Sequence, residues 1–90
     1  MRFEFDPAKS AANKDKHGID FVDAQLLWQD PGRIEFNART SGETRWLTVG
    51  QIGEKLWTAI FTLRGENVRL ISVRRARIEE RQWYEGYQGD

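Results

Sequence analysis

The chain has 90 residues, of which 39% are hydrophobic and 31% charged, so it is long enough for one domain with a single compact core. No run approaches the roughly 18 apolar residues of a membrane span, and residues 1 to 10 lack a signal peptide's apolar core, so we expect a cytoplasmic protein. The lack of cysteine excludes disulfides and sulfur-ligated zinc, and a single histidine excludes a histidine-rich metal site.

The 14 basic and 14 acidic residues balance, which argues against a protein that coats nucleic acid by bulk electrostatics. Their distribution along the chain is uneven. The stretch from Arg64 to Arg81 holds six arginines and only three glutamates. An anionic ligand is therefore expected to meet the C-terminal third of the chain first.

The first third of the chain predicts a short strand and two helices. Residues 2 to 5, RFEF, alternate polar and apolar side chains, which is typical of a half-buried strand. Asp6 is a good N-cap and Pro7 suits the first helical position, so a helix is predicted from Pro7 to His17. An apolar stripe behind a capping-box-like pair of aspartates predicts a second helix from about residue 20 to about residue 30.

The rest of the chain predicts strands followed by one helix. Four segments have strand-like patterns, near residues 33 to 38, 45 to 50, 55 to 63 and 68 to 76, and a helical pattern runs from Arg77 to about Tyr87. Consecutive strands with short loops form an antiparallel meander. We therefore expect a single α+β domain, with two N-terminal helices and a C-terminal helix packed on an antiparallel sheet of four to five strands.

Several motifs appear in a characteristic order between Phe3 and Glu85. The segment FEFDPAKSAANKDKHGIDFVDAQLLWQDP contains F-x-x-D-x-x-K-x-x-x-N-x-x-K-H-G, followed by F-x-x-A and a DP turn. Further on, GETRWLTVGQI carries a tryptophan strand after an acidic turn. The segment LWTAIFTLRGENVRLISVRRARIEERQWYE contains R-x-I-S-x-R-x-A and a closing Y-E. In these motifs the chain resembles the BrnT family of bacterial toxins.

This resemblance implies a RelE-like fold and a ribonuclease toxin of a type II toxin–antitoxin pair, which inhibits translation and growth by cleaving RNA. It also implies a partner, a BrnA-type antitoxin with a ribbon-helix-helix DNA-binding domain. The expected complex is a toxin dimer with two antitoxin chains, in a 2:2 assembly. No cofactor, metal or membrane is expected.

The segment LISVRRAR, residues 70 to 77, raises the question of which arginine faces a ligand. Neighbours on a regular strand point to opposite faces, so Arg74 and Arg75 diverge unless the strand ends or bulges. In a regular strand Arg75 shares the side of Ile71 and Val73, where a guanidinium needs a carboxylate or phosphate partner. The alternatives are solvation of an edge strand or an ion pair with an acid: Asp23, Glu79 or Glu80.

RNA cleavage without a metal ion has three requirements. A ribose 2′-hydroxyl must be activated, the extra charge of the transition state must be stabilised, and the leaving 5′-oxygen must be protonated. Arginine suits the second task because its planar fork stays charged and donates two hydrogen bonds to a phosphate. The candidates are Arg64, Arg74, Arg75 and Arg81.

Three further side chains are candidates for proton transfer or charge donation. His17 is the only residue that ordinarily changes charge near neutral pH, although a histidine in a last helical turn is also a common C-terminal cap. Lys16 is the alternative charge donor. Tyr84 falls on the same helix face as Arg77 and Arg81, and the resemblance to RelE-like nucleases suggests a catalytic role for it. Ordinary packing against the sheet is the other interpretation.

Two other functions remain open from the sequence. The chain is also compatible with a non-catalytic module that binds nucleic acid or protein through a basic face, and with a degenerate toxin that only binds its antitoxin. Three tryptophans, Trp28, Trp46 and Trp57, lie in apolar periodic segments and are predicted to belong to the core.

Overall fold

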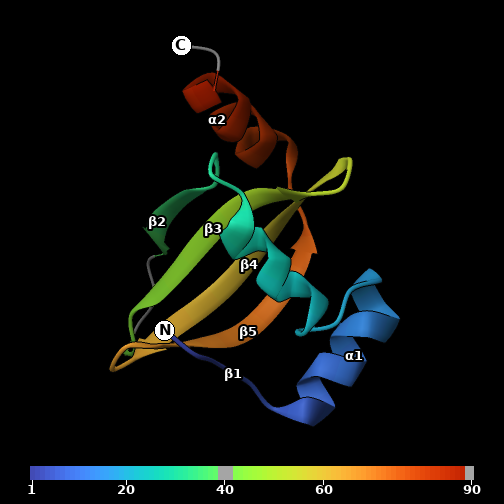
Figure 1. Cartoon of the computed structure of the whole chain (residues 1–90), viewed down its shortest axis with the longest axis vertical. Helices are drawn as coiled ribbons and strands as arrows, with labels where there is room; N and C mark the ends of the chain where they lie inside the picture. The colour runs from blue at the N-terminus through green and yellow to red at the C-terminus, as the bar shows by residue number, and fades with distance from the viewer. Residues whose placement is uncertain (39–41, 89–90) are drawn as a thin grey trace.

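The structure, a computed structural model, describes residues 1 to 38 and 42 to 88 of the chain. Its elements follow in the predicted order: β1 Phe3–Glu4, α1 Pro7–His17, the 3₁₀ helix η1 Asp23–Gln29, β2 Ile34–Ala38, β3 Arg45–Ile52, β4 Lys55–Arg64, β5 Asn67–Arg75 and α2 Ile78–Gln88 (Figure 1). No helix in the described part of the chain is long and apolar enough to cross a membrane.

The five strands form one sheet in the order β1-β5-β4-β3-β2. Strands β2 to β5 form the predicted antiparallel meander. β1, however, pairs with β5 in parallel, with Phe3 opposite Val68, so the expectation of a strictly antiparallel sheet was wrong and the sheet is mixed. β1 runs parallel to β5 because the chain that leaves β1 continues into α1 alongside β5. Asn13 of α1 lies beside Val73, further along β5 than the residues that β1 pairs with.

α1 begins and ends where its capping residues predict. The Asp6 side chain accepts a hydrogen bond from the backbone N–H of Ala8 at 2.8 Å. Gly18 ends the helix with a φ of 85°, in the left-handed region. The helix lies along the outer edge of β5. There Asn13 Nδ2 donates to the Val73 carbonyl at 2.9 Å, and Asn13 Oδ1 accepts from the Val73 N–H at 3.2 Å. The buried side-chain amide of Asn13 thus satisfies backbone groups of β5 that the two-residue strand β1 does not reach.

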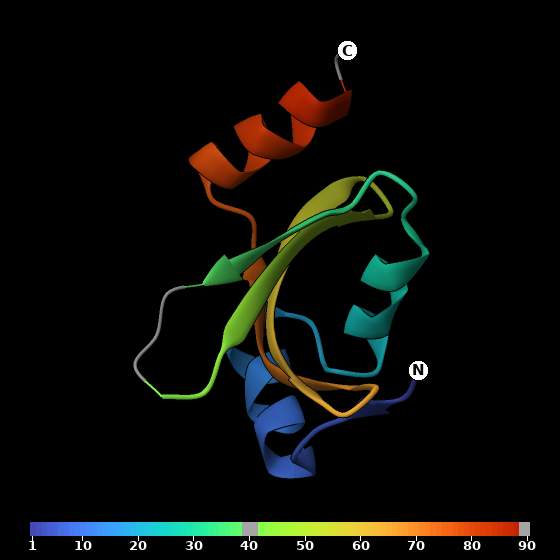
Figure 2. The ribbon, with the colours of Figure 1, turned by 90° about the vertical axis from the view of Figure 1, so that its left-hand side faces the viewer.

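The second predicted helix is a 3₁₀ helix rather than an α-helix. Asp20 Oδ1 accepts hydrogen bonds from the backbone N–H groups of Val22 and Asp23, and Pro31 follows soon after the helix, so only seven helical residues lie between two fixed turns. η1 covers one face of the sheet and packs on β3, and its Ala24 and Leu27 are fully buried in a core cluster shared with residues of β4 and β5. α2 lies at one end of the opposite face (Figure 2).

A β-bulge in β5 decides which way its last residues point. The register with β4 shifts so that Ile71 is the extra residue. Leu70 and Val73 are therefore both buried in the core although they are three positions apart. Beyond the bulge the alternation resumes, so Arg75 lies on the same side as Val73, as predicted, and Arg74 takes the opposite face, under α2.

Candidate functional site

Arg74 is held in a buried ion pair at the junction of β5 and α2. Its Nη1 and Nη2 donate to the two carboxylate oxygens of Glu80, at 2.7 and 2.9 Å, and Glu80 is only 5% exposed. Glu80 also accepts from the Thr58 hydroxyl at 2.9 Å and from the backbone N–H of Arg77 at 2.8 Å. Burial by itself raises the pKa of Glu80, but hydrogen bonds from Arg74, Arg77 and Thr58 outweigh it and lower that pKa to about 2.

Arg75 is positioned by contacts other than an ion pair in the described part of the chain. Its guanidinium carbon lies 5.5 Å from the ring centroid of Trp57, and its Nε donates to the Leu56 carbonyl at 3.3 Å. Within residues 1–38 and 42–86, no carboxylate lies within ion-pair distance of Arg75. The residue is exposed, so Arg75 is a solvent-accessible cation whose orientation is set by Trp57 and the Leu56 carbonyl.

The last turn of α1 lies on the same edge of the sheet as Arg75. The hydrogen bonds of Asn13 fix α1 beside Val73, and the helix continues toward the end of β5 (Figure 1). Lys16 and His17 belong to this last turn; Lys16 is exposed and His17 is partly buried. The structure therefore places both predicted proton or charge donors in the helix that packs beside β5, the strand that ends in Arg75.

Tyr84 links α2 to the opposite layer of the molecule. Its hydroxyl donates to Asp30 Oδ2 at 2.8 Å, and the side chain is only 8% exposed. Asp30 also accepts the backbone N–H groups of Gln51 and Gly32, each at 2.8 Å. Burial, together with the hydrogen bond to Asp30, raises the pKa of Tyr84 to about 12, so the phenol stays protonated. This geometry matches the packing interpretation of Tyr84.

Arg81 follows the end of β5, in α2, whereas Arg64 precedes its start, in β4. Arg81 is exposed in α2, one residue after Glu80. Arg64 ends β4 and pairs in register with Asn67, whereas Arg75 is the last residue of β5, roughly 27 Å away along nine extended residues. Arg64 Nη2 instead lies 3.8 Å from Glu43, with both side chains half exposed. The structure thus separates Arg64 from the other predicted site residues.

A family model described as the ribonuclease toxin BrnT of a type II toxin–antitoxin system matches residues 5–80, most of the chain. The chain belongs to the BrnT family. No curated protein matches it in a parallel comparison. The resemblance that the motifs indicated is therefore confirmed. For a BrnT ribonuclease toxin, the natural candidate surface is the end of β5 with Arg75 and the adjoining turns of α1 and α2.

Two residues of this BrnT surface were missed as site candidates. Trp57 is a core residue, as its apolar segment predicts, but its ring also makes a cation–π contact with the guanidinium of Arg75. Lys55 lies two positions before Trp57 on β4 and is exposed on the same face. Strand alternation alone relates Lys55 to Trp57, whereas only the register of β4 with β5 relates them to Arg75.

At this BrnT surface, a metal ion would require a set of ligand side chains held close together. Among the residues that the structure describes, no group of three or more His, Asp or Glu side chains is arranged to hold a metal ion. The chemistry that the arrangement itself offers is phosphate binding by a fixed guanidinium and proton transfer from a neighbouring helix end.

Proposed function

We propose that this chain is a cytoplasmic endoribonuclease toxin that cleaves RNA without a metal ion and thereby inhibits translation and growth. The observation that carries the proposal is the setting of Arg75, an exposed guanidinium oriented by Trp57 and the Leu56 carbonyl. A planar, permanently charged fork of this kind donates two hydrogen bonds to a phosphate. Family membership supplies the RNA substrate class.

In the proposed reaction the ribose 2′-oxygen attacks the adjacent phosphorus and its proton passes to water. The bond from phosphorus to the 5′-oxygen breaks, and that oxygen takes up a proton from His17, with Lys16 as the alternative donor. The products are a 2′,3′-cyclic phosphate and a 5′-hydroxyl end. Arg75 stabilises the charge that builds on the phosphoryl oxygens, and removal of such a donor typically lowers the rate by about 10²- to 10³-fold.

The remaining basic residues of the surface either bind RNA or hold α2 in place. Arg81, in the first turn of α2, and Lys55, two residues before Trp57 on β4, are exposed, and in this mechanism they contact flanking phosphates, which adds affinity without reading sequence. Arg74 acts through Glu80, by fixing the start of α2 against the sheet. Tyr84 holds α2 to Asp30 in the same way. Arg74 and Tyr84 are therefore positioning residues in this mechanism.

The proposed partner is a BrnA-type antitoxin with a ribbon-helix-helix domain, in a 2:2 complex. The family description names a type II toxin–antitoxin system, which supports an antitoxin in general. An acidic or amphipathic segment of the antitoxin, laid across the surface of Arg75 and Arg81, would neutralise the cations that bind RNA.

One observation favours a second candidate. The polar groups of Arg74 and Tyr84, two of the predicted catalytic residues, are engaged by Glu80 and Asp30. A non-catalytic binding module, or a degenerate toxin that only binds antitoxin, needs no free catalytic groups there. Either would bind its partner in a salt-sensitive manner and leave RNA intact.

Incubation of the purified chain with RNA, with and without EDTA, tests the proposal. We expect cleavage that persists in the chelator and yields cyclic-phosphate and 5′-hydroxyl ends. Loss of cleavage on adding EDTA, or no cleavage at any protein concentration, would contradict it. Intact RNA together with salt-sensitive binding would support the binding module, and expression without growth arrest would support the degenerate toxin.

A further inference from the structure

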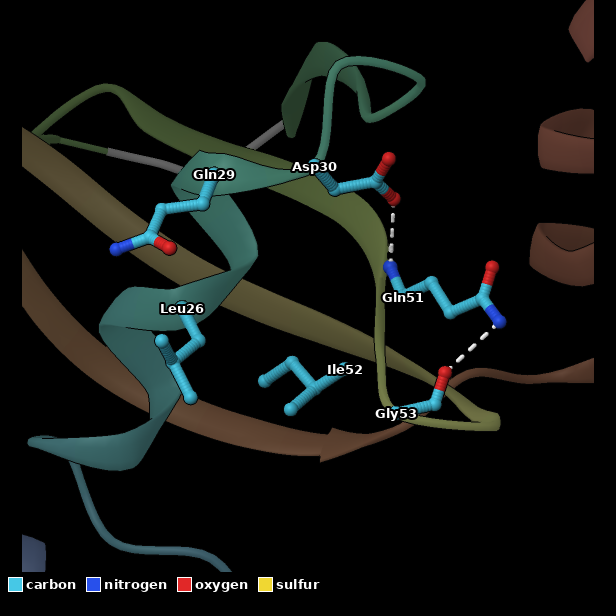
Figure 3. A pocket seen from close by; sticks show the side chains of 6 residues that line it. All are labelled: Leu26, Gln29, Asp30, Gln51, Ile52 and Gly53. Atoms are coloured by element: carbon cyan, nitrogen blue, oxygen red, sulfur yellow. Dashed lines mark hydrogen bonds between the residues drawn. The ribbon is translucent and has the colours of Figure 1, made fainter.

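A depression of about 350 Å³ lies between the end of η1 and the end of β3. Six residues line it: Leu26, Gln29, Asp30, Gln51, Ile52 and Gly53 (Figure 3). The side chain of Ile52 points toward Leu26 across the depression, whereas the side chain of Gln51 turns away and donates to the Gly53 carbonyl at 2.9 Å. The depression therefore has aliphatic walls and a polar rim. Its volume is near the lower end of the range for small-ligand sites, roughly 300–1,000 Å³.

The polar groups of the rim differ in their availability. Both oxygens of Asp30 are engaged, by backbone N–H groups and by Tyr84, so this carboxylate serves the fold. The amide of Gln29 has no hydrogen-bond partner in the described part of the chain, and the side chain is exposed. A side-chain amide offers a donor and an acceptor next to each other, which matches the edge of a nucleobase such as adenine.

Strand register relates the depression to Arg75. Gly50, Trp57 and Arg75 lie opposite one another on β3, β4 and β5, so Gly50 and Arg75 are separated by two strand spacings, on the order of 10 Å. Ile52 lies two residues beyond Gly50 and faces the same side of the sheet. Its register partner, Lys55, is exposed there. Within residues 1–38 and 42–86, Lys55 forms no ion pair, so one further cation lies between the proposed phosphate site at Arg75 and the depression.

We propose that the depression holds one nucleobase of the RNA whose phosphate lies on Arg75, with adenine the best match. Leu26 and Ile52 contact the faces of the base, and the Gln29 amide reads its edge. Single-stranded RNA is commonly recognised in this way, by bases splayed out of the stack and bound along their hydrogen-bonding edges. The inference rests on the proposed function for its ligand class, and it adds a specificity site that the cleavage chemistry does not require.

Binding of mononucleotides to the full chain tests the site without any need for cleavage. In two-dimensional amide NMR spectra, we expect adenosine 3′-monophosphate to shift the Gln29 side-chain amide and the backbone amides of Ile52 and Gly53. Inorganic phosphate is expected to shift only signals near Arg75. Identical shifts with phosphate and with the nucleotide would overturn the proposal.

A matched pair of substitutions separates the depression from the rest of η1. Leu26 lines the depression and is 45% exposed, whereas Val22, just before η1, is 60% exposed and outside it. Leu26→Glu is expected to weaken nucleotide binding at least about tenfold, in line with the loss of one base contact, and Val22→Glu is expected to leave it unchanged. Equal weakening by both variants would overturn the base site.

The two proposals fail in different ways. A chain that binds nucleotides in the depression but leaves RNA intact refutes the proposed function and upholds the base site. A chain that cleaves RNA, with nucleotide shifts confined to the surroundings of Arg75, upholds the function and overturns the base site. If both hold, Gln29→Ala changes the relative cleavage of different sequences, whereas Arg75→Ala lowers cleavage of all of them.

Discussion

Arg74 and Glu80 form a two-pronged ion pair that ties the end of β5 to the first turn of α2, with hydrogen bonds of 2.7 and 2.9 Å. The Glu80 side chain is only 6% exposed and that of Arg74 is 16% exposed. Removal of one partner from such a pair leaves the other charge buried and uncompensated. The pair therefore matters to stability whether or not the arginine touches RNA.

Glu80→Ala should lower the free energy of unfolding by about 3 kcal/mol, because Arg74 loses its carboxylate and the Thr58 hydroxyl loses its acceptor. Urea denaturation measures the change. Glu79→Ala, an exposed position in the same turn, should stay within about 0.5 kcal/mol of the parent chain. Equal losses in both variants would show that the ion pair does not contribute as described.

Acid should destabilise the fold through the same residue. The pKa of Glu80 is about 2 in the folded chain against an ordinary value of 4.5, so the unfolded chain binds the proton more readily. The contribution of Glu80, about 3 kcal/mol for this difference, is fully present above pH 4.5 and is lost as the pH falls toward 2. Urea denaturation across this window should show a shallower decline for Glu80→Gln, and an unchanged decline would contradict the assignment.

Tyr84→Phe should lower the free energy of unfolding by about 2 kcal/mol, since it removes a hydrogen bond to a carboxylate and leaves Asp30 with one donor fewer. Tyr84 ionises at a pKa of about 12 rather than 10, so its contribution is present below pH 10 and is lost as the pH rises toward 12. Phenolate absorbance should show a late transition that the variant lacks. A parent chain without that late transition would contradict the contact.

Arg75→Ala should lower RNA cleavage by about 10²-fold or more while it changes the free energy of unfolding by less than about 1 kcal/mol, the worth of an exposed cation–π contact. Arg75→Lys keeps the charge but not the fork, so it should restore cleavage only in part. Arg64 ends β4 opposite the first residue of β5, far from Arg75, so Arg64→Ala should stay within about threefold of the parent rate. A larger loss for Arg64→Ala than for Arg75→Ala would contradict the placement of the site at the end of β5 that holds Arg75.

His17→Gln should lower the rate of the cleavage step by about 10²-fold, because the leaving oxygen loses its proton donor. Lys16→Gln should mainly weaken RNA binding and reduce its salt dependence, since it removes one exposed cation. Single-turnover kinetics separate the two effects. The reverse result, with the larger rate loss in Lys16→Gln, would assign the proton transfer to the lysine.

Local patterns predicted most of the secondary structure. α1 spans Pro7–His17 as expected, because an N-cap, a proline and a terminal glycine act within one or two turns of the residues they organise. The four meander strands follow from alternation and turn residues in the same way. The direction of β1 and the 3₁₀ form of η1 were not predictable, since both depend on where the connecting segments meet the sheet.

The sequence by itself determined the family, the α+β class, and a cluster of arginines around residues 74 to 81. Only the tertiary structure decided that Arg74 is neutralised by Glu80, that Arg75 faces solvent over Trp57, and that Tyr84 is bound to Asp30. The physical reason is that hydrogen-bond partners and strand register are set by contacts between distant segments. The bulge at Ile71, which lets both Leu70 and Val73 reach the core, is likewise announced by no local pattern.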